Sequence, residues 1–294
     1  EPIAPQPNFL LPGVTEEVKA AQAVKDKPIL VITGNPPYSG ASKNNSPFVK
    51  ATIDAYKMVD GKPLGEKNSK WLQDDYVKFI RFAQMKMDEV EEGIVGIITN
   101  HSWLDNPTFR GMRQSLTKTF DQIWILDLHG STKPKEMVPE GLENENVFDI
   151  QKGVAIALFV KKRGAPKGIF FAEFWGSRIE KYKAAADAGF STIPWQPVDF
   201  RAPYYMFRPM DWQHWDEYAD GWQIADSVRP EVEKQQIFKI NVLGFQTHRD
   251  HFAIAFDKKA IQHRVSDMLD ERLSDQHIAE TYKIPNNRDW KIKD

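Results

Sequence analysis

The stretch that decides the fold runs from residue 28 to residue 38 and reads Pro-Ile-Leu-Val-Ile-Thr-Gly-Asn-Pro-Pro-Tyr. Its first six residues form a short apolar, β-branched run before Gly34, which predicts a fully buried strand. A second such run, Ile94–Thr99, follows a segment with helical spacing from Asp74 to Met87. Strands that alternate with helices are typical of an α/β protein with a largely parallel sheet.

Three more apolar runs predict strands at 123–128, 154–160 and 169–174. Because the segment Gly130–Gly153 lacks a helical pattern, we expect the first two of these strands to be antiparallel. Segment 39–70 is polar and predicts a long loop. Helices are expected at 15–24, 106–116, 177–188 and 259–273, and a further strand is expected at 252–256.

Composition narrows the class of protein. The chain has 294 residues, of which 41% are hydrophobic, enough for a sizeable core. No apolar run reaches the ~18 residues of a membrane span, so we expect no membrane partner. The N-terminus lacks a signal-peptide pattern, and the absence of Cys excludes disulfides and thiolate sites, which is compatible with a cytoplasmic protein. A net charge of −2 excludes a uniformly basic nucleic-acid coat but leaves room for a local basic groove.

The tetrapeptide Asn35-Pro36-Pro37-Tyr38 carries the most specific chemistry in the chain. It follows a predicted strand, and sites in open α/β sheets gather at the carboxyl ends of strands. The prolines lack N–H groups and stiffen the segment, so the Asn35 side-chain oxygen and the Pro36 carbonyl can both accept from one amine. Two such acceptors draw an arylamine nitrogen toward tetrahedral geometry and free its lone pair for attack. The alternative is that Asn-Pro-Pro is only a stiff turn.

This tetrapeptide resembles the catalytic motif of amino-group DNA methyltransferases, specifically the adenine-N6 enzymes of the gamma class. The chain is most similar to the methylase part of large single-polypeptide restriction–modification enzymes. The resemblance is strong over residues 28–175 and weaker beyond them. The runs that carry it are Asp74–Ala83, Gly96–Leu104, Phe109–Arg113, Asn146-Val147-Phe148, Tyr205–Tyr218 and Gly244–Asp250.

The resemblance implies transfer of a methyl group from S-adenosylmethionine to an adenine that is flipped out of double-stranded DNA. Asn35 and Pro36 would hold the adenine amine, with Pro37 in the same catalytic segment, and Asn35 would also border the cofactor. Tyr38 would stack on the base, and Phe148 would press on its opposite face or edge. The expected phosphate contacts are Arg110, Arg113, Lys133, Lys135 and Arg249.

The chain departs from the family pattern upstream of the tetrapeptide. Only 34 residues precede Asn35, and none of them forms the Gly-rich S-adenosylmethionine loop of the family. We therefore expect a fragment, inactive in isolation, with the C-terminal half of a Rossmann-like methyltransferase sheet and most of the cofactor pocket outside the chain. The expected parts are an N-terminal segment 1–27, a partial methyltransferase catalytic domain 28–190, an aromatic-rich connector 191–235 and the beginning of a target-recognition domain 236–294.

A missing half of the sheet would leave the strand at 28–33 with a free edge. Uncovered strands and apolar faces pair readily with other chains. We expect this edge to be covered by residues 1–27, by the missing N-terminal part of the same enzyme or by another chain.

Other functions remain open at this point. The same tetrapeptide occurs in methyltransferases of protein glutamine and of RNA guanine, because their target nitrogens are equally planar. As an isolated chain, the protein could also act only as a non-catalytic DNA-binding or assembly module. The mixture of aromatic residues and arginines over 195–229 fits nucleic-acid binding and interdomain packing equally well.

The histidines give no recognised metal motif. His-Glu-x-x-His is absent, and His248-x-x-His251 has no acidic constellation of a known type nearby. We therefore expect no metal site and histidines that are satisfied or exposed. The histidines considered are His101, His129, His248, His251 and His263.

Overall fold

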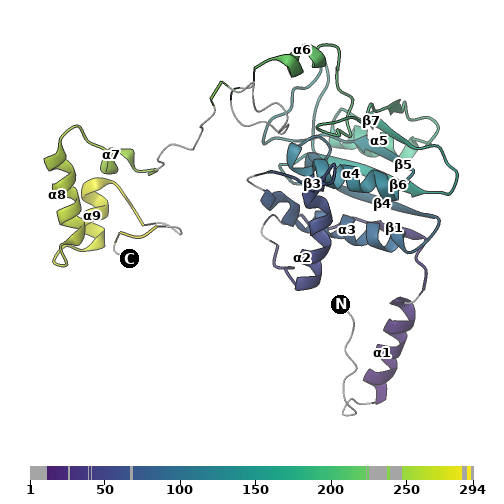
Figure 1. Cartoon of the computed structure of the whole chain (residues 1–294), viewed down its shortest axis with the longest axis horizontal. Helices are drawn as coiled ribbons and strands as arrows, with labels where there is room; N and C mark the ends of the chain where they lie inside the picture. Colours follow the sequence, from purple (N-terminus) through teal and green to yellow (C-terminus); the bar gives the residue numbers. More distant parts are fainter. Residues whose placement is uncertain are drawn as a thin grey trace. The chain divides into compact units, whose positions relative to one another are not determined.

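The computed structural model of the chain describes residues 12–25, 27–38, 40, 42–66, 69–222, 224, 237–238, 247–286 and 290–292. The chain divides into two compact units, Glu1–Gly221 and Trp222–Asp294 (Figure 1). The division falls inside segment 191–235, which the sequence designates a connector. Among the described helices, none combines the length and apolar character that crossing a membrane requires.

A six-stranded sheet in the order β1-β4-β6-β5-β7-β8 forms the centre of the first unit. β1 is parallel to β4 and β5 is parallel to β7, whereas β6 runs antiparallel to both of its neighbours and β8 antiparallel to β7. The strands are β1 (Val31–Gly34), β4 (Gly93–Asn100), β5 (Gln122–Asp127), β6 (Val154–Lys161), β7 (Gly168–Glu173) and β8 (Gln196–Pro197).

The α/β class and the antiparallel pairing of 123–128 with 154–160 are confirmed. The prediction of a largely parallel sheet is wrong, because the sheet is mixed. Between β5 and β6 the chain forms no helix that could carry it back across the sheet, so β6 re-enters at the edge where β5 ends. That edge therefore holds the carboxyl ends of β1, β4, β5 and β7 together with the start of β6.

Apolar side chains on alternate positions of the strands cover both faces of the sheet. On one face, Val95, Ile123 and Ala157 belong to the main core, which includes α3 (Asp75–Asp88) and α4 (Arg110–Thr119) (Figure 1). Residues of the opposite face form a second cluster with Val147, Phe148 and Trp195 packed into it. Its strand members are Leu126, Val154 and Ala172.

The outermost strand β1 is not buried as predicted. Within the described part of the chain it pairs only with β4, and Val31 is 64% exposed. Phe79 and Phe82 on the neighbouring helix α3 are half exposed. Helix α1 (Pro12–Lys25), the described part of residues 1–27 that precedes the strand, contributes no strand beside β1. Which segment covers this edge stays a prediction.

Segment 39–70 contains regular structure where a long loop was predicted. Ser46 begins α2 by accepting a hydrogen bond from the backbone N–H of Val49 at 3.3 Å. Ile53 and Tyr56 are fully buried, so this segment is held by packing that its polar composition conceals. The elements are α2 (Pro47–Ile53), η1 (Asp54–Lys57), β2 (Met58–Val59), β3 (Lys62–Pro63) and η2 (Ser69–Gln73).

The short elements after β4 and beyond β7 complete the first unit. They are η3 (His101–Trp103), η4 (Pro107–Phe109), α5 (Arg178–Asp187) and α6 (Trp215–Asp220). Helices α1, α3, α4 and α5 lie where the sequence predicts helices, with small differences at their ends.

The second unit is a small helical body with α7 (Asp250–Ala253), α8 (Lys258–Leu269) and α9 (Asp275–Tyr282). Its core consists of Ile278, Ile284 and Ile292, with Phe252 and Trp290 among the side chains packed against it. The strand predicted at 252–256 is wrong, because Phe252 lies in α7 and residues 254–257 are irregular. The helix predicted at 259–273 is confirmed as α8, which ends earlier.

Candidate functional site

The tetrapeptide Asn35–Tyr38 lies directly after β1, at the carboxyl edge of the sheet. The Tyr38 hydroxyl donates to the Asn35 side-chain oxygen at 3.1 Å and lies 3.4 Å from the carbonyl of Ile98 on β4. Asn35 is exposed, Pro36 is buried, and Tyr38 is half-buried. Burial raises the pKa of Tyr38 to about 12, which keeps its hydroxyl protonated near neutral pH. The segment is therefore anchored to the sheet while the Asn35 amide stays accessible.

A cavity of about 380 Å³ opens beside Tyr38. Its volume falls in the ~300–1,000 Å³ range of small-molecule sites. Aromatic rings form much of the wall: Tyr38 meets Tyr76 edge to face at a centroid distance of 6.2 Å, and Tyr76 lies 6.5 Å from Phe109. The Trp71 ring is 45% exposed and also lines the space. The polar lining residues are Asp74, Asn100, Ser102, Asn106, Gln151 and Lys152.

A second, more apolar cavity of about 310 Å³ lies along β1. Asn35, Pro36 and Pro37 form part of its wall, and Phe79 and Phe82 contribute rings from α3. The tetrapeptide thus contributes to two cavities, with Tyr38 lining the aromatic one and the first three residues lining the apolar one. Such an arrangement can hold a planar group against Tyr38 and a second molecule on the other side of Asn35.

Two of the predicted phosphate contacts are structural side chains. Arg113 is fully buried and donates to the carbonyl oxygens of Trp103, Asn106, Tyr204 and Tyr205. Burial lowers the pKa of Arg113 to about 9.

Arg110 is likewise buried, and it bonds to Glu66 and to the carbonyls of Leu64 and Pro107. A phosphate could reach either guanidinium only if this packing opened. We therefore correct the assignment and withdraw Arg110 and Arg113 as phosphate contacts.

The other three predicted contacts remain accessible. Lys133 and Lys135 are exposed in the segment between β5 and β6. Arg249 belongs to the second unit, where its guanidinium lies 4.0 Å from the centroid of the Trp290 ring.

Phe148 is not among the residues that line the cavity beside Tyr38. Its ring packs against the second core cluster, and its backbone N–H donates to the Asn146 side chain at 2.9 Å. The neighbouring residues Ile150, Gln151 and Lys152 line the cavity instead. Phe148 would therefore have to leave this packing to contact a base held against Tyr38.

Several side chains of the aromatic segment that follows β7 pack within the first unit, whereas Tyr218 and Trp222 are exposed. Phe207 is fully buried, and Arg208 pairs with Asp105 and Asp127. Trp212 and Trp215 meet edge to face at 5.1 Å. This favours the packing interpretation for these residues; Arg229 lies outside the described residues.

The sequence did not single out Trp71, Asp74, Asn100 or Phe109 as site residues. Asn100 carried a usable signal, because it ends a buried strand at the same edge as Asn35. Trp71 carried none, since it lies between the predicted loop 39–70 and the helical spacing that begins at Asp74. His101 and His129 lie at this edge as well, beside three carboxylates, whereas His248, His251 and His263 belong to the second unit.

Comparison with protein families matches residues 236–294 to a family described as the Type ISP C-terminal specificity domain. The match covers the residues assigned above to the beginning of a recognition domain. A comparison with curated protein sequences finds no match.

Solved structures of three protein–DNA complexes resemble this chain in fold. The ATP-dependent Type ISP restriction–modification enzyme LlaBIII bound to DNA matches with a TM-score of 0.64 and 22% identity over 94% of this chain. A nuclease-deletion mutant of the Type ISP enzyme LlaGI, in complex with a DNA substrate mimic, matches with a TM-score of 0.64 and 22% identity over 92%. A DrdV–DNA complex matches with a TM-score of 0.63 and 24% identity over 87%. The chain spans 19%, 26% and 26% of those chains, respectively.

Proposed function

We propose that this chain is the part of a Type ISP-like restriction–modification enzyme that binds double-stranded DNA and holds a flipped adenine for methylation at its N6 amine. The observation that carries the proposal is the position of Asn35–Tyr38. The Asn35 amide is accessible at the carboxyl end of β1, and Tyr38 borders an aromatic cavity of about 380 Å³. The specificity-domain match and the fold shared with DNA-bound enzymes support the DNA part of the proposal.

The chemistry proposed for Asn35 and Pro36 follows from their acceptors. Two oxygens that accept both N–H bonds of an adenine amine localise the nitrogen lone pair and orient it. The Asn35 oxygen already accepts from the Tyr38 hydroxyl at 3.1 Å, which fixes its direction before a base arrives. The Tyr38 ring offers a face on which the base can stack. No side-chain base is needed in this step, because the amine proton can leave after the methyl group has arrived.

S-adenosylmethionine would supply the methyl group, and the described residues fit only one side of such a cofactor. The apolar cavity next to Asn35 can cover part of a nucleoside, and a Cβ added to Gly34 would meet no atom within 4 Å. However, the residues that line this cavity include no carboxylate that could accept bonds from ribose hydroxyls. We therefore propose that most of the cofactor pocket comes from a segment that covers the β1 edge, either the N-terminal part of the same enzyme or another chain.

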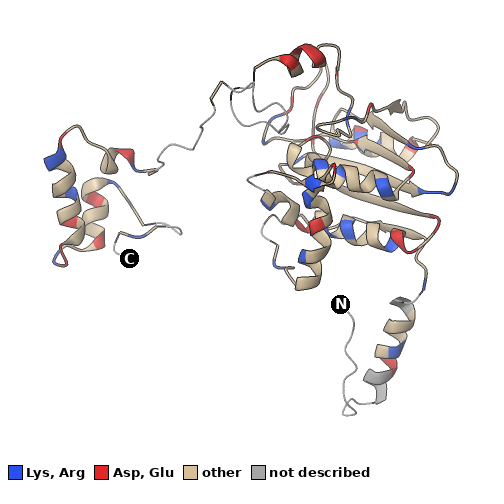
Figure 2. Cartoon of the chain, viewed as in Figure 1, with Lys and Arg blue, Asp and Glu red and all other residues tan. Residues whose placement is uncertain are grey.

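Lys133, Lys135 and Arg249 are the phosphate contacts that we retain. The two lysines are exposed on the segment that leads to Asn146 and Phe148, close in sequence to the residues beside the cavity. Helix α6, in contrast, carries Asp216, Glu217 and Asp220, and Figure 2 shows it as an acidic element. Acidic side chains repel phosphates, so we do not expect α6 to face DNA.

Base flipping by the chain itself tests this proposal. Duplexes selected from a random library for binding to the 294-residue chain would be remade with the fluorescent base 2-aminopurine at each adenine position in turn. We expect the fluorescence to rise at one position, and Tyr38→Ala to abolish most of that rise while the chain still binds DNA. The matched control is Tyr218→Ala on the acidic helix α6, where the ring is exposed and we expect no effect.

The outcomes separate this proposal from the alternatives. Tight DNA binding without a fluorescence change at any position would favour a non-catalytic DNA-binding module. Binding to RNA or to glutamine-containing peptides in preference to duplex DNA would favour the other substrates of the same tetrapeptide. Equal fluorescence in Tyr38→Ala and the unchanged chain would contradict the role of Asn35–Tyr38.

A further inference from the structure

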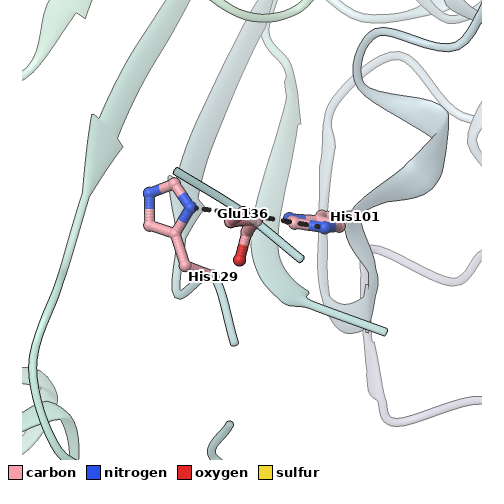
Figure 3. Close-up of side chains that lie close together, drawn as sticks. All are labelled: His101, His129 and Glu136. Carbon is pink, nitrogen blue, oxygen red and sulfur yellow. Dashed lines mark hydrogen bonds and ion pairs between the residues drawn. The ribbon is translucent and has the colours of Figure 1, made fainter. Parts of the chain in front are cut away.

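Three side chains from separate segments meet at the carboxyl edge of the sheet, beyond the ends of β4 and β5. His101 begins η3 after β4, His129 follows β5, and Glu136 lies in the segment between β5 and β6 (Figure 3). Glu136 Oε1 lies 3.0 Å from His129 Nδ1 and 3.9 Å from His101 Nε2. The side chains of His101, His129 and Glu136 are 11%, 1% and 15% exposed, respectively. Solvent therefore has little access to the point where they converge.

Further contacts orient each of these side chains. His101 Nδ1 lies 3.0 Å from Asp127 Oδ1, and His129 Nε2 lies 3.1 Å from Glu173 Oε2. The second oxygen of Glu136 accepts from the backbone N–H of Ser131 at 2.8 Å and from the Asn144 amide at 2.9 Å. Each histidine thus uses one nitrogen on a carboxylate and turns the other toward Glu136, which is how outer partners orient the histidines of metal sites.

Packing holds the two rings as well. His129 stacks on Trp175 with a centroid distance of 3.5 Å and an angle of 16°. Gly153 lies against His101 so closely that an added Cβ would fall 2.3 Å from the ring. The rings can therefore not easily turn away from Glu136.

Both ring nitrogens of His129 lie beside carboxylate oxygens, Nδ1 at 3.0 Å from Glu136 and Nε2 at 3.1 Å from Glu173. A metal ion bound at Nδ1 would leave Nε2 to donate its hydrogen to Glu173. The His101 and His129 ring centroids are 6.4 Å apart, so both rings border the same small space.

Carboxylates face both histidines. Asp127 lies beside His101, and Glu136 and Glu173 lie beside His129. Asp127 Oδ2 makes no hydrogen bond within the described residues and faces Arg208 Nη2 at 3.2 Å, and Arg208 also pairs with Asp105.

We propose that His101 Nε2, His129 Nδ1 and Glu136 Oε1 bind a divalent transition-metal ion of the zinc type, with water as the fourth ligand. The three atoms lie within 4.8 Å of one another. Ligands about 2.0 Å from a tetrahedral ion stand about 3.3 Å apart, between the two spacings of 3.0 and 3.9 Å found here. Two imidazoles and a carboxylate suit zinc, whereas magnesium and calcium prefer oxygen donors alone.

The ion would join the ends of β4 and β5 to the segment that carries Lys133, Lys135 and Asn146. That segment contains few regular elements, so a metal cross-link would replace the ordering that a helix or strand would provide. The inference does not depend on the proposed methyltransferase function, since it rests only on the geometry of the cluster.

Zinc binding by the whole 294-residue chain tests the proposal. After removal of metals with a chelator, titration calorimetry with Zn²⁺ should show one site per chain. X-ray absorption of the zinc-loaded chain should show only nitrogen and oxygen ligands at about 2.0–2.2 Å, including two imidazoles.

A graded set of variants locates the ion. Glu173→Gln changes only the outer partner of His129 and should weaken zinc binding about 10–100-fold. Glu136→Gln removes a direct ligand and should weaken it more, while circular dichroism stays unchanged. Glu140→Gln is the matched control, because Glu140 is exposed in the same segment and should bind zinc like the unchanged chain.

Three outcomes would overturn the proposal. The first is no stoichiometric zinc binding at micromolar concentration, which would leave the three side chains as a metal-free hydrogen-bond network. The second is equal binding by Glu136→Gln and the unchanged chain. The third is loss of binding on His251→Ala, which would place the ion in the second unit.

Discussion

Two regions of the central sheet differ in how completely this chain buries their side chains. Around β5 and β7, even the charged side chain of Asp127 is buried and bonded to its neighbours. Around β1, apolar side chains such as Val31 and Phe82 remain half or more exposed. β1 is as apolar in sequence as β4, so the difference shows that the neighbours of a strand decide its burial. The chain itself buries the region around β5 and β7, whereas the exposed apolar side chains around β1 are typical of an interface with another segment or chain.

The largest expected effect concerns the buried interior of the first unit. Arg113→Ala should lower the free energy of unfolding by at least about 3 kcal/mol, because four buried or partly buried carbonyl groups lose their donor. Urea denaturation measures the change. Arg163→Ala, at an exposed arginine, should change stability by less than about 0.5 kcal/mol. A stable Arg113→Ala chain that has lost only DNA affinity would instead restore Arg113 as a phosphate contact.

The second effect concerns the His101–His129–Glu136 cluster, which is also largely buried. Zinc at about 100 times its dissociation constant should stabilise the metal-free chain by about 2.7 kcal/mol, because the ion binds the folded state. Thermal unfolding with and without zinc measures the shift. The shift should be much smaller for Glu136→Gln and unchanged for Glu140→Gln. If zinc raised the unfolding temperature equally in all three chains, the stabilising ion would bind somewhere other than this cluster.

The third effect concerns the open β1 edge. Val31→Lys should reduce self-association in sedimentation velocity, because a lysine blunts an exposed strand edge, while stability changes by less than about 0.5 kcal/mol. Ile179→Lys is the matched control, since Ile179 is 77% exposed on α5, the helix that follows β7, and β1 does not pair with β7. A chain that stays monomeric at every concentration would contradict the view that this edge is an interface.

The smallest effect concerns single phosphate contacts. Lys133→Ala should lower DNA affinity modestly and reduce the slope of log affinity against log salt by about 0.9, as expected for one lost phosphate contact. Fluorescence anisotropy across a salt series measures the slope. Lys183→Ala on α5 replaces a lysine that is exposed elsewhere and should leave the slope unchanged. Equal slopes in both variants would show that Lys133 makes no phosphate contact.

The core of the fold was predictable from local pattern. The apolar runs at 94–99, 123–128 and 154–160 became β4, β5 and β6, because each run is long enough to be recognised by itself. The burial of β1 was not predictable, because it depends on a strand that the described residues do not supply. The α2–η2 segment was missed since two buried side chains, Ile53 and Tyr56, hold an otherwise polar stretch.

The candidate site was predictable only where one short motif contains it. Asn35–Tyr38 could be recognised as a unit, and the structure places these residues beside two cavities. His101, His129 and Glu136 come from three segments, so their convergence required the register of β4, β5 and β6. Arg110 and Arg113 misled for a related reason, because a charged residue on a helix gives no sign of being buried among backbone carbonyls.

Photocrosslinking of a flipped base tests the central claim most directly. A selected duplex with azidoadenine at the position that responds in the 2-aminopurine series would be irradiated with the chain, and the adduct mapped by mass spectrometry. The account predicts an adduct on Tyr38 or on Trp71, which border the same cavity. An adduct confined to the second unit, or the same adduct from azidoadenine at every position of the duplex, would contradict it.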